Sequence, residues 1–286
     1  MIWKHASGRF DIGSRPLLMG VLNVTPDSFS DGGCFLETSA AVDHGLRLLD
    51  DGADLIDIGG ESTRPGAEPV PAAEEIQRVL PVIRELARLR PAAVLSVDTY
   101  KAAVAKEALQ AGASVVNDVG AGLWDPEMLG VVAGGGAGYI AMHSRGTPRT
   151  MQADPHYANV TADVMEFLSS RRRALDEAGI PAERVAFDPG VGFGKTVSHN
   201  LELITQAAAF KALGRPVVWG LSRKSFIFKS LGLTPEDSRL PGGLAAHARL
   251  ISAGGPQIWR VHEVAETRQF VHMWELLHND AARRTG

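Results

Sequence analysis

Short apolar runs that each end in a polar residue recur along the whole chain, and this repeat constrains the fold more than any other feature. Eight of these runs have the length and composition of buried strands, and they cover residues 17–22, 54–58, 93–97, 114–116, 139–142, 184–187, 216–221 and 257–261. Between and after them, apolar residues at helical spacing predict helices over 39–50, 71–89, 101–110, 126–133, 159–178, 200–213, 225–231, 238–253 and 264–277. Looser alternation over residues 2–12 predicts a small hairpin that caps the fold.

Alternating strands and helices predict an α/β protein, and two architectures compete. A (β/α)8 barrel, or TIM barrel, uses eight such units in about 250 residues, which suits a chain of 286 residues without a linker-like stretch. An open doubly wound sheet usually carries a glycine fingerprint after its first strand. Residues 23–26 (NVTP) do not match that fingerprint. We therefore predict a TIM barrel in which residues 1–286 form a single domain with a short N-terminal hairpin.

The composition narrows the class of protein and of partner. Hydrophobic residues make up 45% of the chain and charged residues 22%, which is typical of globular proteins. The net charge of −4 argues against nucleic acid as a partner. Cys34 is the only cysteine, which excludes an internal disulfide and fits a reducing compartment. With no apolar run of membrane-spanning length and no signal-peptide core at residues 1–13, we expect a soluble, cytoplasmic protein that acts on small molecules.

Polar residues at the far ends of the predicted strands are the candidate functional residues. Because the carboxyl ends of barrel strands meet at one mouth, where barrel enzymes hold their active sites, these side chains should lie together. They are Asn23, Thr63, Arg64, Asp98, Asn117, Asp118, His143, Asp188, Ser222, Arg223, Lys224, Arg260 and His262. Taken singly, each has a structural alternative: an aspartate can cap a helix, and an asparagine can stabilise a turn. As a set at one end of the barrel, they indicate a site.

The members of this set divide into acceptors and cations. Asp98, Asn117 and Asp188 supply acceptors that suit the donor-rich edge of a heterocycle. The cationic side chains suit a polyanion such as pyrophosphate, and they are Arg64, Lys224, Arg260 and His262. Spacing by two residues predicts that Arg260 and His262 share a face of their strand, and the same spacing predicts a shared face for Ser222 and Lys224.

Motifs for metals and nucleotides are weak in this chain. The sequence has no HExxH motif, no Cys/His cluster and no dense group of carboxylates, so we expect no tight intrinsic metal site. A Mg²⁺ ion held mainly by a substrate phosphate and by Asn23 is compatible with the residues present. Residues 190–196 (GVGFGKT) are similar to a Walker A loop, but three residues separate Gly190 from Gly194 where four are required. We interpret these glycines as allowing the backbone to approach a flat ligand.

Eight motifs at the strand ends together carry a family resemblance. They are residues 19–33 (MGVLNVTPDSFSDGG), 56–67 (IDIGGESTRPGA), 96–101 (SVDTYK), 115–118 (VVND), 142–152 (MHSRGTPRTMQ), 188–195 (DPGVGFGK), 220–225 (GLSRKS) and 260–264 (RVHEV). On these motifs the chain resembles the dihydropteroate synthases, pterin-binding TIM-barrel enzymes of folate biosynthesis. The resemblance implies a Mg²⁺-dependent transferase that condenses 7,8-dihydropterin-6-ylmethyl diphosphate with 4-aminobenzoate, giving 7,8-dihydropteroate and pyrophosphate.

The resemblance also implies roles for individual residues. It implies a pterin pocket of Asp98, Asn117, Met142, Asp188 and Lys224, a diphosphate site of Asn23 on the Mg²⁺ side with Arg64, Arg260 and His262, and a 4-aminobenzoate site of Thr63, Pro65, Phe193, Lys224 and Ser225 with Phe29 nearby. From these, the residues expected to carry catalysis are Asn23, Arg64, Asp98, Lys224, Arg260 and His262. The resemblance further implies mobile loops at 24–37 and 61–70, sulfonamide sensitivity, and a homodimer formed through the late helices.

Two other readings of the same motifs stay open. A methyltetrahydrofolate:corrinoid methyltransferase would share the barrel and the pterin pocket, but it has no use for a diphosphate site. The cationic residues of this chain therefore count against it: Arg64, Lys224, Arg260 and His262. A non-catalytic paralogue that only binds a pterin should have lost part of the motif at 25–33 or at 62–66, and both are intact. We therefore expect the synthase.

Overall fold

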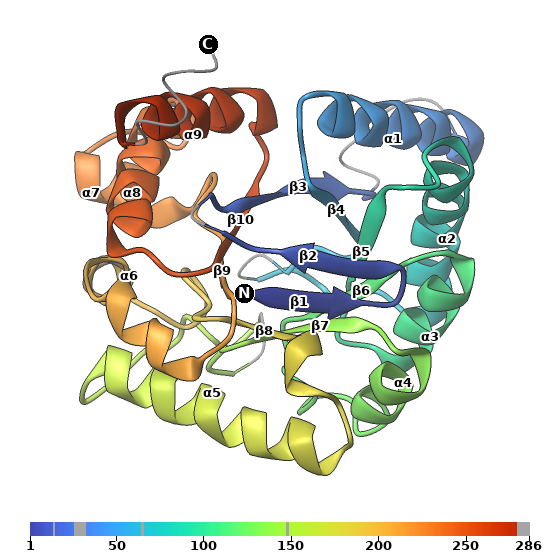
Figure 1. Cartoon of the computed structure of the whole chain (residues 1–286), viewed down its shortest axis with the longest axis horizontal. Coiled ribbons are helices and arrows are strands. Elements are labelled where there is room, and N and C mark those ends of the chain that lie inside the picture. The colour runs from blue at the N-terminus through green and yellow to red at the C-terminus, as the bar shows by residue number, and fades with distance from the viewer. Residues whose placement is uncertain (14, 26–32, 64–65, 147–148, 279–286) are drawn as a thin grey trace.

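Eight parallel strands close into a barrel, which confirms the predicted TIM barrel (Figure 1). The computed structural model describes residues 1–13, 15–25, 33–63, 66–146 and 149–278. The barrel strands are β3 (Leu17–Asn23), β4 (Leu55–Gly59), β5 (Val94–Asp98), β6 (Val115–Asp118), β7 (Gly138–Met142), β8 (Val185–Asp188), β9 (Val217–Trp219) and β10 (Gln257–Val261). Neighbours in the chain are neighbours in the sheet, and β10 pairs with β3 to close it.

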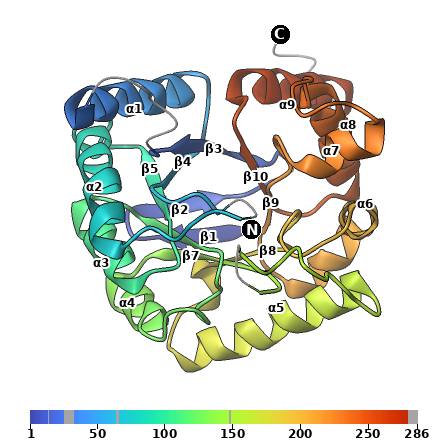
Figure 2. The same ribbon diagram turned by 180° about the vertical axis from the view of Figure 1, so that it is seen from behind.

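Helices surround the barrel and connect its strands (Figures 1 and 2). They are α1 (Gly33–Asp50), α2 (Ala72–Leu89), α3 (Ala102–Ala111), α4 (Met128–Gly135), α5 (Val160–Glu177), α6 (Val197–Thr205), α7 (Ser225–Leu231), α8 (Leu240–Ala253) and α9 (Val264–His278), with 3-10 turns η2 (Ala182–Arg184) and η3 (Ala207–Leu213). In the described part of the chain, no helix is both long and apolar enough to cross a membrane.

The prediction of one helix over residues 200–213 is wrong, because the chain breaks its helix at Gln206. A continuing α-helix would pair the carbonyl of Thr205 with Ala209 N. The guanidinium of Arg249 on α8 donates to that carbonyl, and Ala209 N donates to the carbonyl of Gln206 at 2.9 Å instead. The chain continues as the 3-10 helix η3.

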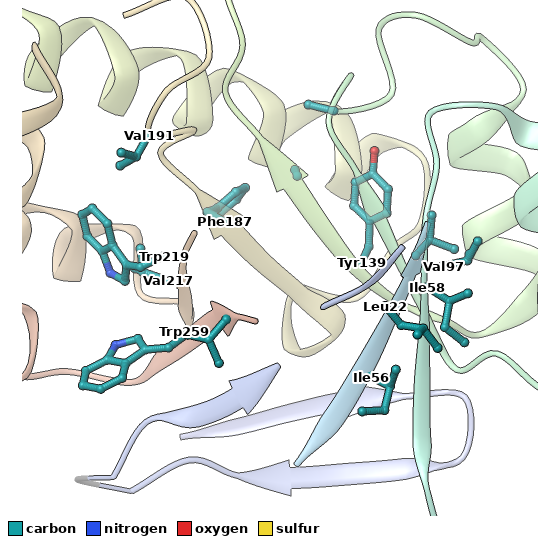
Figure 3. Packing of buried hydrophobic residues seen from close by; sticks show 14 of the residues in the cluster. Leu22, Ile56, Ile58, Val97, Tyr139, Phe187, Val191, Val217, Trp219 and Trp259 are labelled. Atoms are coloured by element: carbon teal, nitrogen blue, oxygen red, sulfur yellow. The ribbon is translucent and has the colours of Figure 1, made fainter. Parts of the chain in front are cut away.

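Alternation along each strand sorts side chains between the interior of the barrel and the surrounding helices. Outward-facing residues such as Ile56, Trp219 and Trp259 form the large core between strands and helices (Figure 3). Inward-facing residues near the strand starts form a second apolar cluster, which comprises Leu17, Met19, Leu55, Val94, Val115, Ile140, Ala186, Val218 and Ile258. The amino-terminal end of the barrel is therefore filled with apolar side chains, as in TIM barrels generally.

An N-terminal hairpin covers that apolar end, as predicted. Its strands β1 (Ile2–His5) and β2 (Gly8–Asp11) are antiparallel, and they lie across the front of the barrel in Figure 1 and behind it in Figure 2. Trp3 is fully buried against the inner apolar cluster, and its indole nitrogen donates to the carbonyl of Arg184 at 3.0 Å. With this end filled and covered, a ligand can enter only from the carboxyl ends of the strands.

Candidate active site

A polar cavity of about 910 Å³ lies at the carboxyl ends of the barrel strands. The predicted residues that line it are Asn23, Thr63, Asp98, Phe193, Lys224, Ser225, Arg260 and His262. A recess of about 30 Å³ shares part of this lining and adds Asn117, Met142 and Asp188. The structure therefore brings together every described residue to which the family resemblance assigned a role. Arg64, Pro65 and Phe29 lie outside the described residues, as do residues 26–32 of the predicted loop at 24–37 and residues 64–65 of the predicted loop at 61–70.

Strand alternation places the polar residues in the mouth. On six strands, the interior residue nearer the mouth lies two residues beyond an apolar interior residue, because side chains on one face of a strand repeat every second residue. The pairs are Leu55 and Asp57, Val94 and Ser96, Val115 and Asn117, Ile140 and Met142, Ala186 and Asp188, and Ile258 and Arg260. The same rule places Asp98 beyond Ser96 and His262 beyond Arg260. The interior side chains therefore change from apolar to mostly polar between one interior position and the next along the strands.

Asp57 organises the polar layer, and the sequence prediction missed it. It is fully buried, and its carboxylate accepts hydrogen bonds from Ser96 Oγ at 2.7 Å, Asn117 Nδ2 at 2.9 Å and Arg260 Nε at 2.6 Å. Arg260 Nη2 also donates to Asp98 Oδ2 at 2.7 Å. The signal in the sequence was a lone aspartate in the middle of an apolar strand (LIDIG), which a barrel buries only if it is paired.

One carboxylate oxygen of Asp98 is available to a ligand. Its Oδ2 pairs with Arg260, whereas its Oδ1 is buried and has no hydrogen-bond partner among the described residues. Burial raises the pKa of Asp98, and the positive charge of Arg260 opposes that rise. Since a buried acceptor is normally satisfied, a donor from a bound molecule is the natural partner for this oxygen.

Asp188 lines the recess from the end of β8. Its Oδ1 accepts from the backbone amide of Gly190 at 2.7 Å, so the nearby backbone is the partner of one of its two oxygens. Burial raises the pKa of Asp188 to about 6, although the Gly190 amide and Lys224 both favour the charged form. Asp98, Asn117 and Asp188 thus place acceptors around one small recess, with Met142 on its wall.

Phe193 and Lys224 face each other where the cavity meets the recess. Lys224 Nζ lies 4.1 Å from the centroid of the Phe193 ring, and both residues line both spaces. A cation over an aromatic face is attractive, so each side chain helps to orient the other. Thr63 and Ser225 also line the larger cavity, Ser225 from the first residue of α7.

The turn before α7 differs from the prediction. β9 ends at Trp219, so strand alternation does not explain why Ser222 and Lys224 both reach the cavity. Instead Lys224 N donates to the carbonyl of Leu221 in a turn, and Arg223 takes a φ of +58°. Ser222 Oγ donates to Glu263 Oε2 and lies 2.9 Å from His262 Nδ1, so this turn is tied to the end of β10.

Glu61, which lines the cavity, is a second residue that the prediction missed. Its carboxylate accepts from Tyr100 Oη at 2.9 Å, from Val70 N at 3.2 Å and from the ammonium of Lys101. Lys101 also pairs with buried Glu75, which the sequence indicates only as an acidic residue in the first turn of a helix. These bonds hold the start of the segment after β4 against β5 and α3.

Two strand-end residues, His143 and Asp118, line neither the cavity nor the recess. Asp118 accepts from Gly120 N, Gly122 N and Tyr139 Oη, so it stabilises its own loop. A Cβ added at Gly190, where φ is +68°, would lie 1.8 Å from the carbonyl oxygen of His143, so this position needs glycine for its approach to the chain's own backbone. Gly190 also lines the recess and Gly192 the cavity, and the approach of these glycines to a flat ligand stays a prediction.

The comparisons agree with this geometry. Residues 19–262 match the family of pterin-binding enzymes. The dihydropteroate synthase of Synechocystis is 42% identical over 94% of this chain and 92% of its own length. The Xanthomonas albilineans dihydropteroate synthase with 4-aminobenzoic acid superposes with a TM-score of 0.85 at 45% identity, covering 93% of this chain and 94% of that one. The same enzyme in complex with 7,8-dihydropteroate gives 0.84 at 42% identity, over 95% and 96%.

The matched region contains every cavity-lining residue of the predicted pterin and diphosphate sites, from Asn23 to His262. Similarity of this extent covers the barrel and its mouth together, since it spans nearly the whole of both chains. The chain belongs to the dihydropteroate synthases, within the family of pterin-binding enzymes.

Proposed function

We propose that this chain condenses 7,8-dihydropterin-6-ylmethyl diphosphate with 4-aminobenzoate in the cavity at the barrel mouth. The bond between the pterin methylene and the diphosphate oxygen breaks, and its electron pair leaves with the diphosphate. The amine nitrogen forms the new bond to the methylene carbon and gives its proton to solvent. The similar enzymes that bind 4-aminobenzoic acid and 7,8-dihydropteroate support this choice of substrates.

The unpartnered Asp98 oxygen is the observation that carries the proposal. A pterin ring presents several N–H groups along one edge, and the recess offers Asp98 Oδ1, Asn117 and Asp188 as their partners. Carboxylates that are buried beside the methylene would also stabilise positive charge that develops there as the diphosphate departs. Met142 would pack against the flat ring.

Arg260 and His262 would receive the diphosphate, with Arg64 as the third expected cation. Arg260 is already bonded to Asp57 and Asp98, so its guanidinium would join the pterin pocket to the leaving-group site. Charge on the leaving oxygens rises as the bond breaks, and fixed cations nearby lower the barrier because they need no reorganisation.

The donor set also fits a Mg²⁺ ion that arrives with the substrate. Asn23 provides a neutral side-chain oxygen at the end of β3, and the described residues contain no group of three or more His, Cys, Asp or Glu side chains that could hold a metal by themselves. Mg²⁺ commonly binds through one or two protein oxygens plus substrate phosphates. When bound, it would neutralise charge on the departing diphosphate.

The aryl amine would lie against Phe193 and the turn that carries Lys224 and Ser225, with Thr63 also on the cavity wall. An aryl amine is uncharged at neutral pH, so it can attack without a strong general base. Pro65 and Phe29 would complete this side through the two loops.

Pyrophosphate release by the purified protein tests the proposal. We expect release to require Mg²⁺, and dihydropteroate to form when 4-aminobenzoate is present. Pterin binding without release would refute the synthase activity in favour of a binding paralogue. No binding of either substrate would refute the assignment of the cavity.

We also propose a homodimer formed through the late helices, with residues 1–286 acting as one domain. Helices α7, α8 and α9 lie side by side in both views (Figures 1 and 2). Four large apolar side chains on or just after them are exposed: Leu231, Leu233, Met273 and Leu277. Light scattering should give twice the chain mass, and Met273→Glu should shift the mass toward the monomer.

The lone cysteine supports a cytoplasmic location.

A further inference from the structure

Lys195, the lysine of the motif that is similar to a Walker A loop, is buried and does not reach the cavity. Only 3% of the surface of Lys195 is exposed. Nζ donates to the carbonyl of Gly190 at 2.9 Å and to the carbonyl of Phe193 at 3.0 Å, and it lies 2.9 Å from His143 Nδ1. An ammonium has three N–H donors, and these three acceptors match them one for one.

The two carbonyls belong to the turn that presents Phe193. Phe193 N donates to Gly190 O at 3.1 Å, so the turn is closed by its own backbone and held from within by Lys195. Gly190 cannot shift toward His143, because their backbones are already in contact. Further along, Gly192 N donates to Asn200 Oδ1 at 2.8 Å. The backbone on both sides of Phe193 is thus fixed to neighbouring elements.

The position of Phe193 matters because its ring contacts Lys224 on the cavity wall. The distance of 4.1 Å between Lys224 Nζ and the ring centroid depends on where the turn holds Phe193. Lys195 itself lines neither the cavity nor the recess. Any effect of Lys195 on a ligand must therefore pass through the turn.

We propose that Lys195 is a positioning residue, whose buried ammonium holds the 190–194 turn so that Phe193 and Lys224 form the binding wall for the aryl amine. The inference rests on the proposed placement of 4-aminobenzoate against Phe193. The proposed role of the glycine-lysine motif is opposite to that of a phosphate-binding loop, because the Lys195 ammonium binds the carbonyls of its own turn.

The charge of Lys195 gives the proposal a pH signature. Burial lowers the pKa of Lys195 to about 7, with Asp188 raising it and Lys224 lowering it further. His143 has a pKa lowered by burial to about 2, so its ring is neutral and Nδ1 can accept. Arg145 and Tyr157 also face this region from the segment after β7. Losing the proton removes one of the three donors, so aryl-amine affinity should fall as the pH rises through about 7.

Steady-state kinetics of Lys195→Met tests the proposal, because methionine keeps the length of the side chain and removes its donors. We expect the KM for 4-aminobenzoate to rise about tenfold or more, as for loss of a charged hydrogen bond. The kcat and the KM for the pterin diphosphate should change far less. Lys4→Met is the matched control, because it makes the same substitution at an exposed lysine, which pairs with Glu183 and lies on the hairpin at the other end of the barrel. It should leave the KM for 4-aminobenzoate unchanged.

Three outcomes would overturn the proposal: equal rises in both KM values, no rise, or the same rise in Lys4→Met. Phe193→Ala tests the placement of 4-aminobenzoate separately from the role of Lys195. If it raises the KM for 4-aminobenzoate and Lys195→Met does not, the placement stands and the role of Lys195 is refuted. If Phe193→Ala has no effect, the placement fails and the inference with it. Should Lys195→Met not fold, the wild-type KM between pH 6 and 9 decides, and a flat profile refutes the proposal.

Discussion

Replacing Asp57 by asparagine should destabilise the barrel, because one buried carboxylate holds three donors there. The Asp57 oxygens accept from Ser96, Asn117 and Arg260, and no part of the residue is exposed. Asparagine has the same shape but keeps only one acceptor oxygen. Whichever way its amide is oriented, an NH₂ group faces at least one of these donors.

The size of the effect follows from these contacts. With the asparagine oxygen toward Asn117 and Arg260, its NH₂ group can donate to Ser96 Oγ, because a hydroxyl also accepts. The loss is therefore the negative charge beside Arg260, and a charge-assisted hydrogen bond contributes about 1.5–3 kcal/mol. Arg260 keeps Asp98 as a partner, so we expect the free energy of unfolding to fall by roughly 1.5–3 kcal/mol, a large share of the total for most domains.

Urea unfolding followed by tryptophan fluorescence measures this change. Glu85→Gln is the matched control, because Glu85 also accepts two hydrogen bonds from an arginine, Arg88, but on the exposed face of α2. Its midpoint should equal that of the wild type, since exposed pairs contribute little. A loss below about 1 kcal/mol in Asp57→Asn, the level of one neutral hydrogen bond, would refute the reasoning that Asp57 holds the polar layer together.

Further outcomes are expected at the substrate sites. Pterin affinity should fall as the pH drops through about 6, because protonation of Asp188 removes an acceptor; isothermal titration that gives a flat profile from pH 5 to 8 would contradict this. EDTA should abolish turnover, and Asn23→Ala should raise the Mg²⁺ concentration needed for half-maximal rate; an unchanged Mg²⁺ requirement would remove Asn23 from the metal site. Arg260→Ala should weaken pyrophosphate binding and also alter pterin affinity, because Arg260 is bonded to Asp98. An unchanged pterin Kd would show that the pterin pocket and the diphosphate site are independent. Sulfamethoxazole should compete with 4-aminobenzoate, and turnover that persists at a saturating dose would contradict ordinary sulfonamide sensitivity.

Strand number, strand order and the polar mouth were predictable because they depend on local pattern. Each strand is a short apolar run, and parallel strands joined by helices leave all their carboxyl ends on one side. Asp98, Asn117 and Asp188 could therefore be assigned to one mouth without any coordinates. The same reasoning failed for residues 200–213, where Arg249 from α8, distant in sequence, takes a carbonyl that a continuing helix would need.

Asp57 and Lys195 show where local pattern stops being sufficient. An aspartate inside a strand signals that a partner exists, but Arg260 lies 203 positions away and only closure of the barrel brings the two together. Lys195 ends a motif that suggests phosphate binding, yet its ammonium is buried against its own turn and His143. Arg260 and His143 are both distant in sequence from the residues that they contact.

The sequence by itself determined the barrel, the mouth and the kinds of side chain gathered there, because periodicity and strand direction are properties of short segments. The tertiary structure alone decided which charges pair, which oxygen of Asp98 stays available and which lysine faces the cavity. The physical reason is that burial and pairing depend on distances across the barrel. Those distances exist only after β10 has paired with β3 and the polar layer has been enclosed.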